Sequence, residues 1–339
     1  MQTLTTVGID LAKNVFQVHG VDQVGRTVLR KRLRRAEVTA FMARLPSCVV
    51  GLEACCGAHY WARVLEGLGH QVKLIAPQFV KPYVMSNKND ANDAEAICEA
   101  VRRPHMRFVH RKSIEQQDVQ ALHRVRSRLI GSRTSLVNQI RGLLAEYGVV
   151  LPQSIGQVRR GLPTVLEDAS NELSTLGRRL FNGLYEQLVD LDKRIEEFDE
   201  EIARLFRSNS VCQRIGEIEG VGPLIATAMI SAIGDGRSFK NGRQLSAWLG
   251  LVPRQESSGG KTRLLGISKR GDSYLRTLLV HGARSVVYRA GSKADRRSHW
   301  IADKQRRLGT NRACVAVANK NARIIWAMLA NEQRYLKST

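Results

Sequence analysis

The sequence has few aromatic residues, few acids relative to bases, and no hydrophobic run long enough to cross a membrane. Its 339 residues include 53 Lys and Arg but only 31 Asp and Glu, which gives a net charge of +22. The longest nearly apolar run, Val221 to Ile233, falls short of the roughly 20 residues that a membrane-spanning helix needs. Met1 to Thr6 lead directly into a strand-like segment, so we expect no signal peptide and a cytoplasmic protein.

Paired metal-binding cysteines are also missing. None of the six cysteines forms a CxxC spacing, so the sequence indicates no zinc site. We expect most of them to be buried, reduced thiols, as is usual in the cytosol. The six are Cys48, Cys55, Cys56, Cys98, Cys212 and Cys314.

The surplus of positive charge predicts a polyanionic partner, and without a membrane anchor that partner is nucleic acid. Half of the surplus lies in one segment: residues 254–312 contain fifteen Lys and Arg and four Asp and Glu. Aromatic residues make up only 6% of the chain, which favours recognition of backbone and shape over base stacking. We therefore expect binding that depends strongly on salt, and a protein associated with the nucleoid.

The first hundred residues show an α/β pattern. Short apolar runs bounded by turn residues predict strands, and segments with helical periodicity lie between them. The predicted strands are Val7–Leu11, Val15–His19, Thr27–Leu29, Cys48–Leu52 and Val72–Ile75, and the predicted helices are Ala36–Leu45, His59–Leu68 and Asn92–Arg103.

The middle of the chain carries two long apolar stripes at three/four spacing, which predict long helices. One runs from Val119 to Tyr147 and the other from Leu173 to Leu205, with a segment containing Pro152 and Pro163 between them. Such stripes are typical of a helical hairpin or coiled coil, although packing in a globular bundle remains open. In either arrangement the apolar stripes form a hydrophobic core or an interface between subunits of an oligomer.

Four acids occupy the ends of predicted elements. Asp10 and Glu53 end strands, and Asp90 and Asp93 lie at the start of a helix. Acids at the carboxyl ends of neighbouring strands point into a shared crevice of an open α/β sheet. Clustered carboxylates repel one another, and magnesium ions relieve that repulsion while clamping the oxygens of a phosphodiester. For Asp90 and Asp93 alone, capping a helix would be an equally good interpretation.

The segments around these acids are recognisable. Gly8 to Lys13, Gly51 to Glu53 and Lys88 to Ala94 resemble the amino-terminal RuvC-like, RNase H-like domain of the DEDD insertion-sequence transposases, relatives of the pilin-gene invertase Piv and of MooV. The resemblance implies that Asp10, Glu53, Asp90 and Asp93 hold metal, with two Mg²⁺ ions expected.

A second set of motifs lies in the basic last third. Gly250 to Pro253, the run Ser257-Ser258-Gly259-Gly260-Lys261, and Gly266 to Arg276 resemble the carboxy-terminal domain of the same family. The resemblance implies that the serine before the glycine attacks DNA and becomes joined to a phosphate. Spacing from Pro253 favours Ser258, and Ser257 remains open. An isolated Ser-Gly pair would be an ordinary loop.

Other residues are candidates for holding nucleic acid. The cations that follow the serine could neutralise phosphate charge, although a solvated surface is the more common role of such residues. Gly220-Val221-Gly222-Pro223 is similar to the turn of helix-hairpin-helix modules, and an ordinary helix-start turn is an equal alternative. The candidates are Lys261, Arg263, Lys269, Arg270, Arg276, Gly220 and Gly222.

Together these patterns predict α/β plus α architecture in three parts. We expect a RuvC-like domain over residues 1–108, a helical coiled-coil hairpin over 109–208, and a mainly helical transposase domain over 209–339. The predicted function is a DNA transposase. The resemblance, which covers essentially the whole chain, also implies a site assembled across a homo-oligomer and a structured guide RNA, called bridge RNA, that pairs with donor and target DNA.

Three other functions fit parts of the pattern. A metal-dependent junction-resolvase nuclease would use the acids without Ser258, and a non-catalytic nucleic-acid-binding protein would need neither. Actin-like ATPases also begin with a strand ending in Gly-Ile-Asp, but Ala12 and Lys13 stand here where those proteins have a phosphate-binding loop.

Overall fold

The computed structural model describes residues 3–84 and 90–336, with the backbone alone at 90 and 91. The chain divides into two compact units, Met1–Ser113 and Ile114–Thr339. The sequence-based division at residues 108 and 208 stays a prediction. Within the described ranges, no helix combines the length and the apolar character that crossing a membrane requires.

The first unit is built on a six-stranded sheet with the order β3-β2-β1-β4-β5-β6. Strands β1, β4 and β5 run parallel, whereas β2 pairs antiparallel with both β1 and β3, and β6 pairs antiparallel with β5. The strands are β1 Thr6–Asp10, β2 Val15–Val21, β3 Thr27–Arg34, β4 Val49–Glu53, β5 Gln71–Ile75 and β6 Phe108–Val109.

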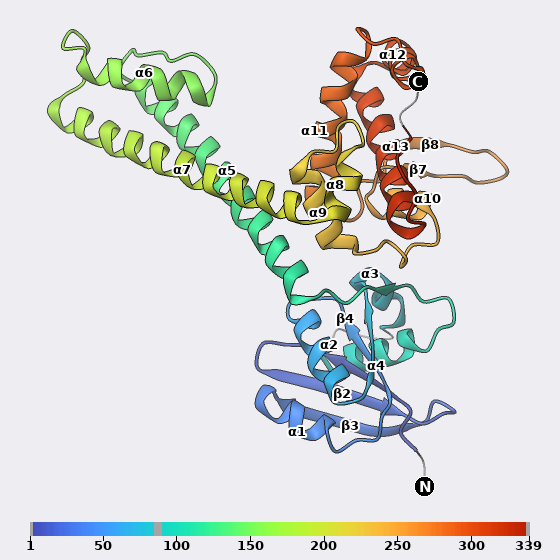
Figure 1. Ribbon diagram of the computed structural model, residues 1–339. Coiled ribbons are helices and arrows are strands. Elements are labelled where there is room, and N and C mark those ends of the chain that lie inside the picture. The colour runs from blue at the N-terminus through green and yellow to red at the C-terminus, as the bar shows by residue number, and fades with distance from the viewer. Residues whose placement is uncertain (1–2, 85–89, 337–339) are drawn as a thin grey trace. The chain divides into compact units, whose positions relative to one another are not determined.

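Helices cover both faces of this sheet, as Figure 1 shows in blue and teal. They are η1 Arg35–Glu37, α1 Val38–Met42, α2 Ala58–Gly67, α3 Pro77–Val80, η2 Lys81–Tyr83 and α4 Asp90–Val101. Val7 and Ile9 of β1 share one hydrophobic core with α1 and α2. Because side chains alternate along a strand, the residues between them face the other side of the sheet, where α4 lies.

The second unit is almost entirely helical. Its elements are α5 Ile114–Ala145, α6 Ile155–Glu167, α7 Thr175–Ser208, α8 Ser210–Gly216, α9 Pro223–Ile233, α10 Gly242–Trp248, β7 Pro253–Gln255, β8 Leu264–Ile267, α11 Ser273–Ala290, α12 Arg296–Leu308 and α13 Thr310–Ala330. In Figure 1 the chain runs out along α5, turns through α6 and returns along α7.

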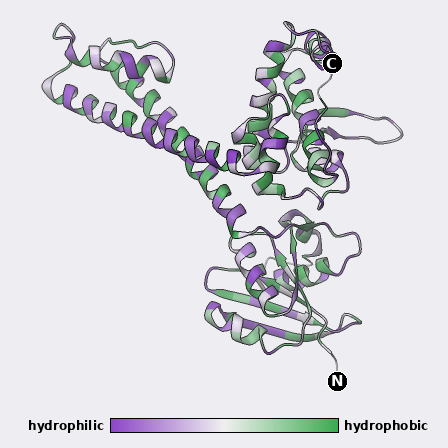
Figure 2. Ribbon diagram, in the orientation of Figure 1, coloured by the Kyte–Doolittle hydropathy of each residue, from purple (hydrophilic) through white to green (hydrophobic). Residues whose placement is uncertain are grey.

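The long helices α5 and α7 pack through their apolar stripes. Ile140 of α5 and Leu188 and Ile195 of α7 belong to one buried cluster, and hydrophilic residues, purple in Figure 2, cover much of both helices. The predicted pair of helices is therefore confirmed, while a coiled coil stays a prediction. The segment between them contains a further helix, α6, with Pro163 inside it. The run of apolar residues at three/four spacing in this stretch was too short to predict that helix.

A second, larger core holds the rest of this unit together. α13 lies at its centre, with Cys314, Val317, Ala318 and Ile325 completely buried. A buried histidine fastens α5 to this part: the His123 ring lies 3.0 Å from the Thr227 hydroxyl of α9 and 2.9 Å from the Tyr274 hydroxyl of α11. The α/β expectation for the chain is confirmed.

Candidate active site

Asp10 and Glu53 end adjacent parallel strands, as the sequence predicted. Ile9 of β1 pairs with Leu52 of β4, so the next residue on each strand is one of the two acids. Leu52, like Ile9, faces the core that α1 and α2 share. Alternation then places both acids on the opposite face, the face that α4 covers, at the carboxyl end of the sheet.

Helix α4 begins at this same end of the sheet because two glycines allow it to lie against the strands. Gly8 and Gly51 pair across β1 and β4. A Cβ atom on Gly8 would collide with the backbone of α4 at Ala94 and Cys98, and one on Gly51 would lie 3.1 Å from the Ile97 side chain.

The direction of α4 follows from its contacts along β1. Ala94 lies over Gly8, and the Cys98 thiol, one turn later, lies 3.8 Å from the carbonyl oxygen of Thr6 at the start of the strand. The helix therefore runs antiparallel to β1, and its first turn lies toward Asp10.

The first turn of α4 carries the other two predicted acids. Asp93 is four residues before Ile97 and so lies on the helix side that faces the sheet. Asp90 is the first helical residue, and its side chain lies outside the described residues. The backbone thus brings all four positions to one end of the sheet. We call them the acidic site.

The charge of the acidic site acts on a neighbouring thiol. The pKa of Cys55 is raised to about 11, first by desolvation and then by the carboxylates of Glu53 and Asp10. Carboxylate oxygens are the hard donors that Mg²⁺ prefers, so the donor set fits that ion. Among the described residues, which leave out the Asp90 side chain, no three His, Cys, Asp or Glu are grouped closely enough to hold a metal.

Ser258 lies at the tip of a β-hairpin formed by β7 and β8. The Lys261 amide donates to the Ser258 carbonyl oxygen at 3.0 Å, and Gly259 and Gly260 between them have φ angles of 56° and 74°. Two consecutive left-handed residues define a type I′ turn, which glycine adopts without strain. The sequence predicted a flexible loop here rather than a hairpin. β7 and β8 have only three and four residues, which is too short to show the alternating pattern of a strand. We call residues 253–267 the serine hairpin.

The two candidate serines differ in their surroundings. The Ser257 hydroxyl accepts a hydrogen bond from the Gln255 amide at 2.9 Å. Both serines are exposed, and within the described part of the chain the Ser258 side chain has no hydrogen bond.

The base of the serine hairpin is held rigidly. The chain segments before and after the hairpin cross at Gly250 and Gly271, which both have left-handed backbones. A Cβ on Gly250 would collide with the backbone of Arg270, and one on Gly271 with the carbonyl oxygen of Trp248. The Arg276 guanidinium donates to the carbonyl oxygens of Leu249 and Arg270 at 3.1 and 3.2 Å. This contact gives Arg276 a structural role, and its predicted role in nucleic-acid binding stays untested.

The other predicted cations line the serine hairpin and the turn after it. Lys261, Arg263, Lys269 and Arg270 are all exposed. Lys269 adopts a left-handed backbone with φ of 54°, which is uncommon for a residue with a side chain. Their positions suit contact with a polyanion on the hairpin.

The turn from Gly220 to Pro223 lies between α8 and α9, which fits both a helix-hairpin-helix turn and an ordinary helix-start turn. Gly220 has φ of 82°, and a Cβ there would collide with the Gly282 carbonyl of α11. Packing alone therefore explains Gly220. Gly222 precedes the first turn of α9, is exposed, and has open space where a Cβ would be.

The prediction that most of the cysteines are buried is confirmed. Cys48, Cys98, Cys212 and Cys314 are buried and Cys55 and Cys56 are exposed, and all six are unpaired.

One group of cations comes together only in the folded chain and was not predicted from the sequence. Arg243, Arg312, Lys320 and Arg323 come from α10 and α13 and line one pocket. Lys320 and Arg323 are three residues apart, and Arg312 lies eight residues before Lys320. On a helix these spacings could have indicated a basic face.

Comparison with known families agrees with both sets of motifs. A family model described as "Transposase IS116/IS110/IS902 family" matches residues 212–299, and a transposase model of the DEDD IS110 type matches residues 7–149.

Similar proteins extend along the whole chain. A probable family 20 transposase of Pseudomonas aeruginosa is 51% identical over 98% of each chain. The transposase for insertion sequence element IS1111A of Coxiella burnetii is 47% identical, over 99% of this chain and 92% of its own. The transposase for element IS1328 of Yersinia enterocolitica is 44% identical over 97% of each.

The motifs, the acidic site and these similarities together define a transposase, an enzyme that rearranges DNA. More particularly, the chain belongs to the IS116/IS110/IS902 transposase family. Its DEDD domain indicates dependence on a divalent metal ion, and its substrate is DNA.

Proposed function

We propose that this transposase cuts and rejoins DNA at the ends of an insertion sequence, with Ser258 as nucleophile and the acidic site as metal holder. The observation that carries the proposal is the common placement of Asp10, Glu53 and the first turn of α4 at one end of the sheet. The strand order, with β2 reversed beside a parallel set, supports an RNase H-like, RuvC-like assignment for the first unit. The relation to Piv and MooV belongs to this proposal.

Metal would be held by Asp10, Glu53, Asp90 and Asp93. Two bound Mg²⁺ ions would supply charge stabilisation at the attacking and leaving oxygens of a phosphodiester. The contribution of the chain is to fix the carboxylates on rigid elements, two at strand ends and two on α4. The mutual repulsion of these carboxylates would be relieved by a bound cation.

In the first step the Ser258 hydroxyl oxygen bonds to the phosphorus, and the bond from phosphorus to the leaving strand breaks. The serine loses its proton to water, and water returns one proton to the leaving oxygen, so that the leaving strand ends in a hydroxyl. In the second step a hydroxyl strand end attacks the phosphoserine, joins the DNA and releases Ser258 with its proton restored. Lys261 and Arg263, both exposed on the hairpin, would neutralise the phosphate. The free hydroxyl of Ser258 favours it over Ser257.

The proposal requires the serine hairpin to reach an acidic site, within one chain or between copies. We therefore propose an oligomer with a composite site. A structured RNA that pairs with donor and target DNA would supply sequence choice, and the surplus of positive charge supports binding of both polymers.

The test is a search for a covalent intermediate. The full-length protein is incubated with DNA from the ends of its element, the candidate RNA and Mg²⁺, and then analysed on a denaturing gel. We expect a DNA–protein species in the wild type and in Ser257→Ala, and none in Ser258→Ala. Adduct that persists in Ser258→Ala but not in Ser257→Ala would move the nucleophile by one residue.

The same experiment separates the alternatives. A junction-resolvase nuclease would cut without forming an adduct and would be unaffected by Ser258→Ala. A non-catalytic binding protein would behave identically when Asp10 and Asp93 become asparagine.

A further inference from the structure

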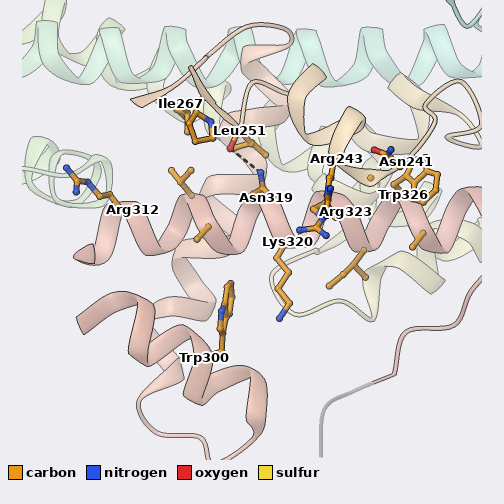
Figure 3. Close-up of a pocket in the computed structure, with 16 residues that line it drawn as sticks. Asn241, Arg243, Leu251, Ile267, Trp300, Arg312, Asn319, Lys320, Arg323 and Trp326 are labelled. Atoms are coloured by element: carbon orange, nitrogen blue, oxygen red, sulfur yellow. Dashed lines mark hydrogen bonds between the residues drawn. The ribbon is translucent and has the colours of Figure 1, made fainter. Parts of the chain in front are cut away.

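A pocket of about 980 Å³ opens along one side of α13 in the second unit (Figure 3). Its walls come from α10, α12, α13 and the base of the serine hairpin. Much of the lining is apolar, including Leu251, Ile267, Val315 and Ile324. We call it the α13 pocket.

Four cations line the α13 pocket without any acid. Arg243 comes from α10, and Arg312, Lys320 and Arg323 come from α13, all labelled in Figure 3. Over the described residues, none of the four forms an ion pair or a side-chain hydrogen bond. Arginines elsewhere in this unit do pair, as Arg133 does with Asp192 at 2.8 Å. The pocket therefore concentrates positive charge that the protein itself leaves uncompensated.

Lys320 shows the effect of this charge. Its ammonium lies 4.3 Å from the centre of the Trp300 ring. The pKa of Lys320 is lowered, first by burial and then by repulsion from Arg297, Arg296 and Arg323. An anion in the pocket would relieve that repulsion.

The pocket is continuous with the serine hairpin. Pro253 and Ile267 pair at the base of the hairpin, and both line the pocket. The Asn319 amide of α13 donates to the Leu251 carbonyl oxygen at 3.1 Å, which fixes the base of the hairpin to the pocket floor. Ser258 is five residues beyond Pro253, about 16 Å along an extended strand. A nucleic-acid strand with a rise of 3.4 Å per nucleotide covers that distance in about five nucleotides.

We propose that the α13 pocket holds an unpaired part of the DNA strand that Ser258 attacks. Phosphates would contact the four cations, and a base would lie against the apolar wall. The volume suits one or two nucleotides rather than a duplex. DNA is favoured over RNA because the pocket adjoins the hairpin that carries Ser258, the proposed nucleophile for DNA. The inference rests on the proposed function, in which Ser258 attacks DNA.

The test is binding of an oligothymidine of about twelve nucleotides, measured by fluorescence anisotropy in EDTA so that no cutting occurs. Arg243→Gln/Arg323→Gln removes two charges from the pocket. Arg194→Gln/Arg204→Gln is the matched control, since it removes two charges from α7, where each arginine pairs with an acid. We expect the pocket variant to bind at least about tenfold more weakly than the control, and its salt slope to fall by about 1.4. Equal affinities of the two double variants, at matched melting temperatures, would overturn the inference.

Tryptophan fluorescence tests whether oligothymidine binds in the α13 pocket. Two tryptophans, Trp300 and Trp326, line the pocket. We expect oligothymidine to quench the wild-type signal, and most of that quenching to be lost when both are replaced by Phe. Quenching that is unchanged in this double variant would overturn the inference. So would an Arg243→Gln/Arg323→Gln protein that, in the same anisotropy assay, loses oligouridine binding but keeps oligothymidine binding. Because the assay needs no covalent step, failure of Ser258 to form an adduct would leave these results as they are.

Discussion

Gly8 and Gly51 are the residues that bring α4 to the acidic site. They pair across β1 and β4, and the helix backbone occupies the space that a side chain on Gly8 would need. A methyl group at Gly8 must push α4 away from the strand, and its first turn carries Asp93. Packing at these two residues therefore controls the geometry of the carboxylates.

Gly8→Ala is expected to destabilise the first unit by about 1–3 kcal/mol, because overpacking a tight contact forces the backbone to move. The control is Gly67→Ala at the end of α2, which has open space around it and should be neutral or slightly stabilising. Urea unfolding of both variants checks the prediction. A Gly8→Ala protein as stable as the Gly67→Ala protein would show that α4 is not tightly seated.

Asp10→Asn and Asp93→Asn are expected to abolish cutting while leaving the fold intact. Each keeps the size of the side chain but removes a charge that a cation needs, and a loss of at least about a hundredfold in rate is expected for a metal ligand. Glu95→Gln on α4 is the control, since this exposed acid pairs with Arg30 on the sheet. Cleavage assays at several Mg²⁺ concentrations measure the effect, and normal cutting by Asp93→Asn would remove this residue from the site.

Among the elements, the serine hairpin depends on its turn. β7 and β8 are short, so the register that places Ser258 opposite Lys261 comes from the two left-handed glycines. The crossing of Gly250 and Gly271 holds the other end of the hairpin. Ser258, the proposed nucleophile, is thus positioned by backbone conformation at both ends of the hairpin.

Gly259→Asn is expected to retain adduct formation, and Gly259→Val to lose most of it. Asparagine tolerates the left-handed conformation, whereas a β-branched residue there costs about 1–2 kcal/mol and favours another turn. The yield of DNA–protein adduct is the measurement. Equal yields from the two variants would mean that turn type does not position the serine.

Across the whole molecule, we expect charge to dominate association with DNA. A net charge of +22 and unpaired cations on the hairpin and in the α13 pocket provide many phosphate contacts. Neutralising six or more phosphates releases as many counterions, so affinity falls steeply with salt.

We expect the affinity for duplex DNA to fall about a thousandfold or more between 50 and 200 mM salt. Titrations at a series of salt concentrations give the slope directly. A slope corresponding to only one or two phosphates would contradict an extended basic surface.

The stability of the second unit is expected to depend on pH through His123. Burial, and then Arg126, lower the pKa of this ring to about 4 in the folded chain. The unfolded chain takes up a proton near pH 6.5, and the folded chain only near 4, so stability falls as the pH drops through this window and is unaffected above it.

Between pH 7 and pH 5 the wild type should lose about 2 kcal/mol more than His123→Gln, which removes the titrating group. Urea unfolding at both pH values makes the comparison, and His59, whose pKa is also lowered to about 4, is present in both proteins. Parallel losses in the two proteins would show that His123 does not carry the effect.

Local pattern was enough to determine the strands that end in Asp10 and Glu53, the long helices α5 and α7, and the motifs that identify the family. Hydrophobic periodicity and turn residues act over neighbouring residues, so they can be read without knowing what lies across the core. The same approach missed α6, which carries a proline inside it, and the serine hairpin, whose strands are too short to show alternation.

Tertiary structure decided which of these pieces meet. The seating of α4 brings Ala94 onto Gly8 and Ile97 onto Gly51, which lie on different strands far earlier in the chain. The α13 pocket gathers Arg243 of α10 with Arg312, Lys320 and Arg323 of α13. Sequence spacing does not predict such contacts, because packing between distant segments depends on the shape of the surfaces that the fold brings together.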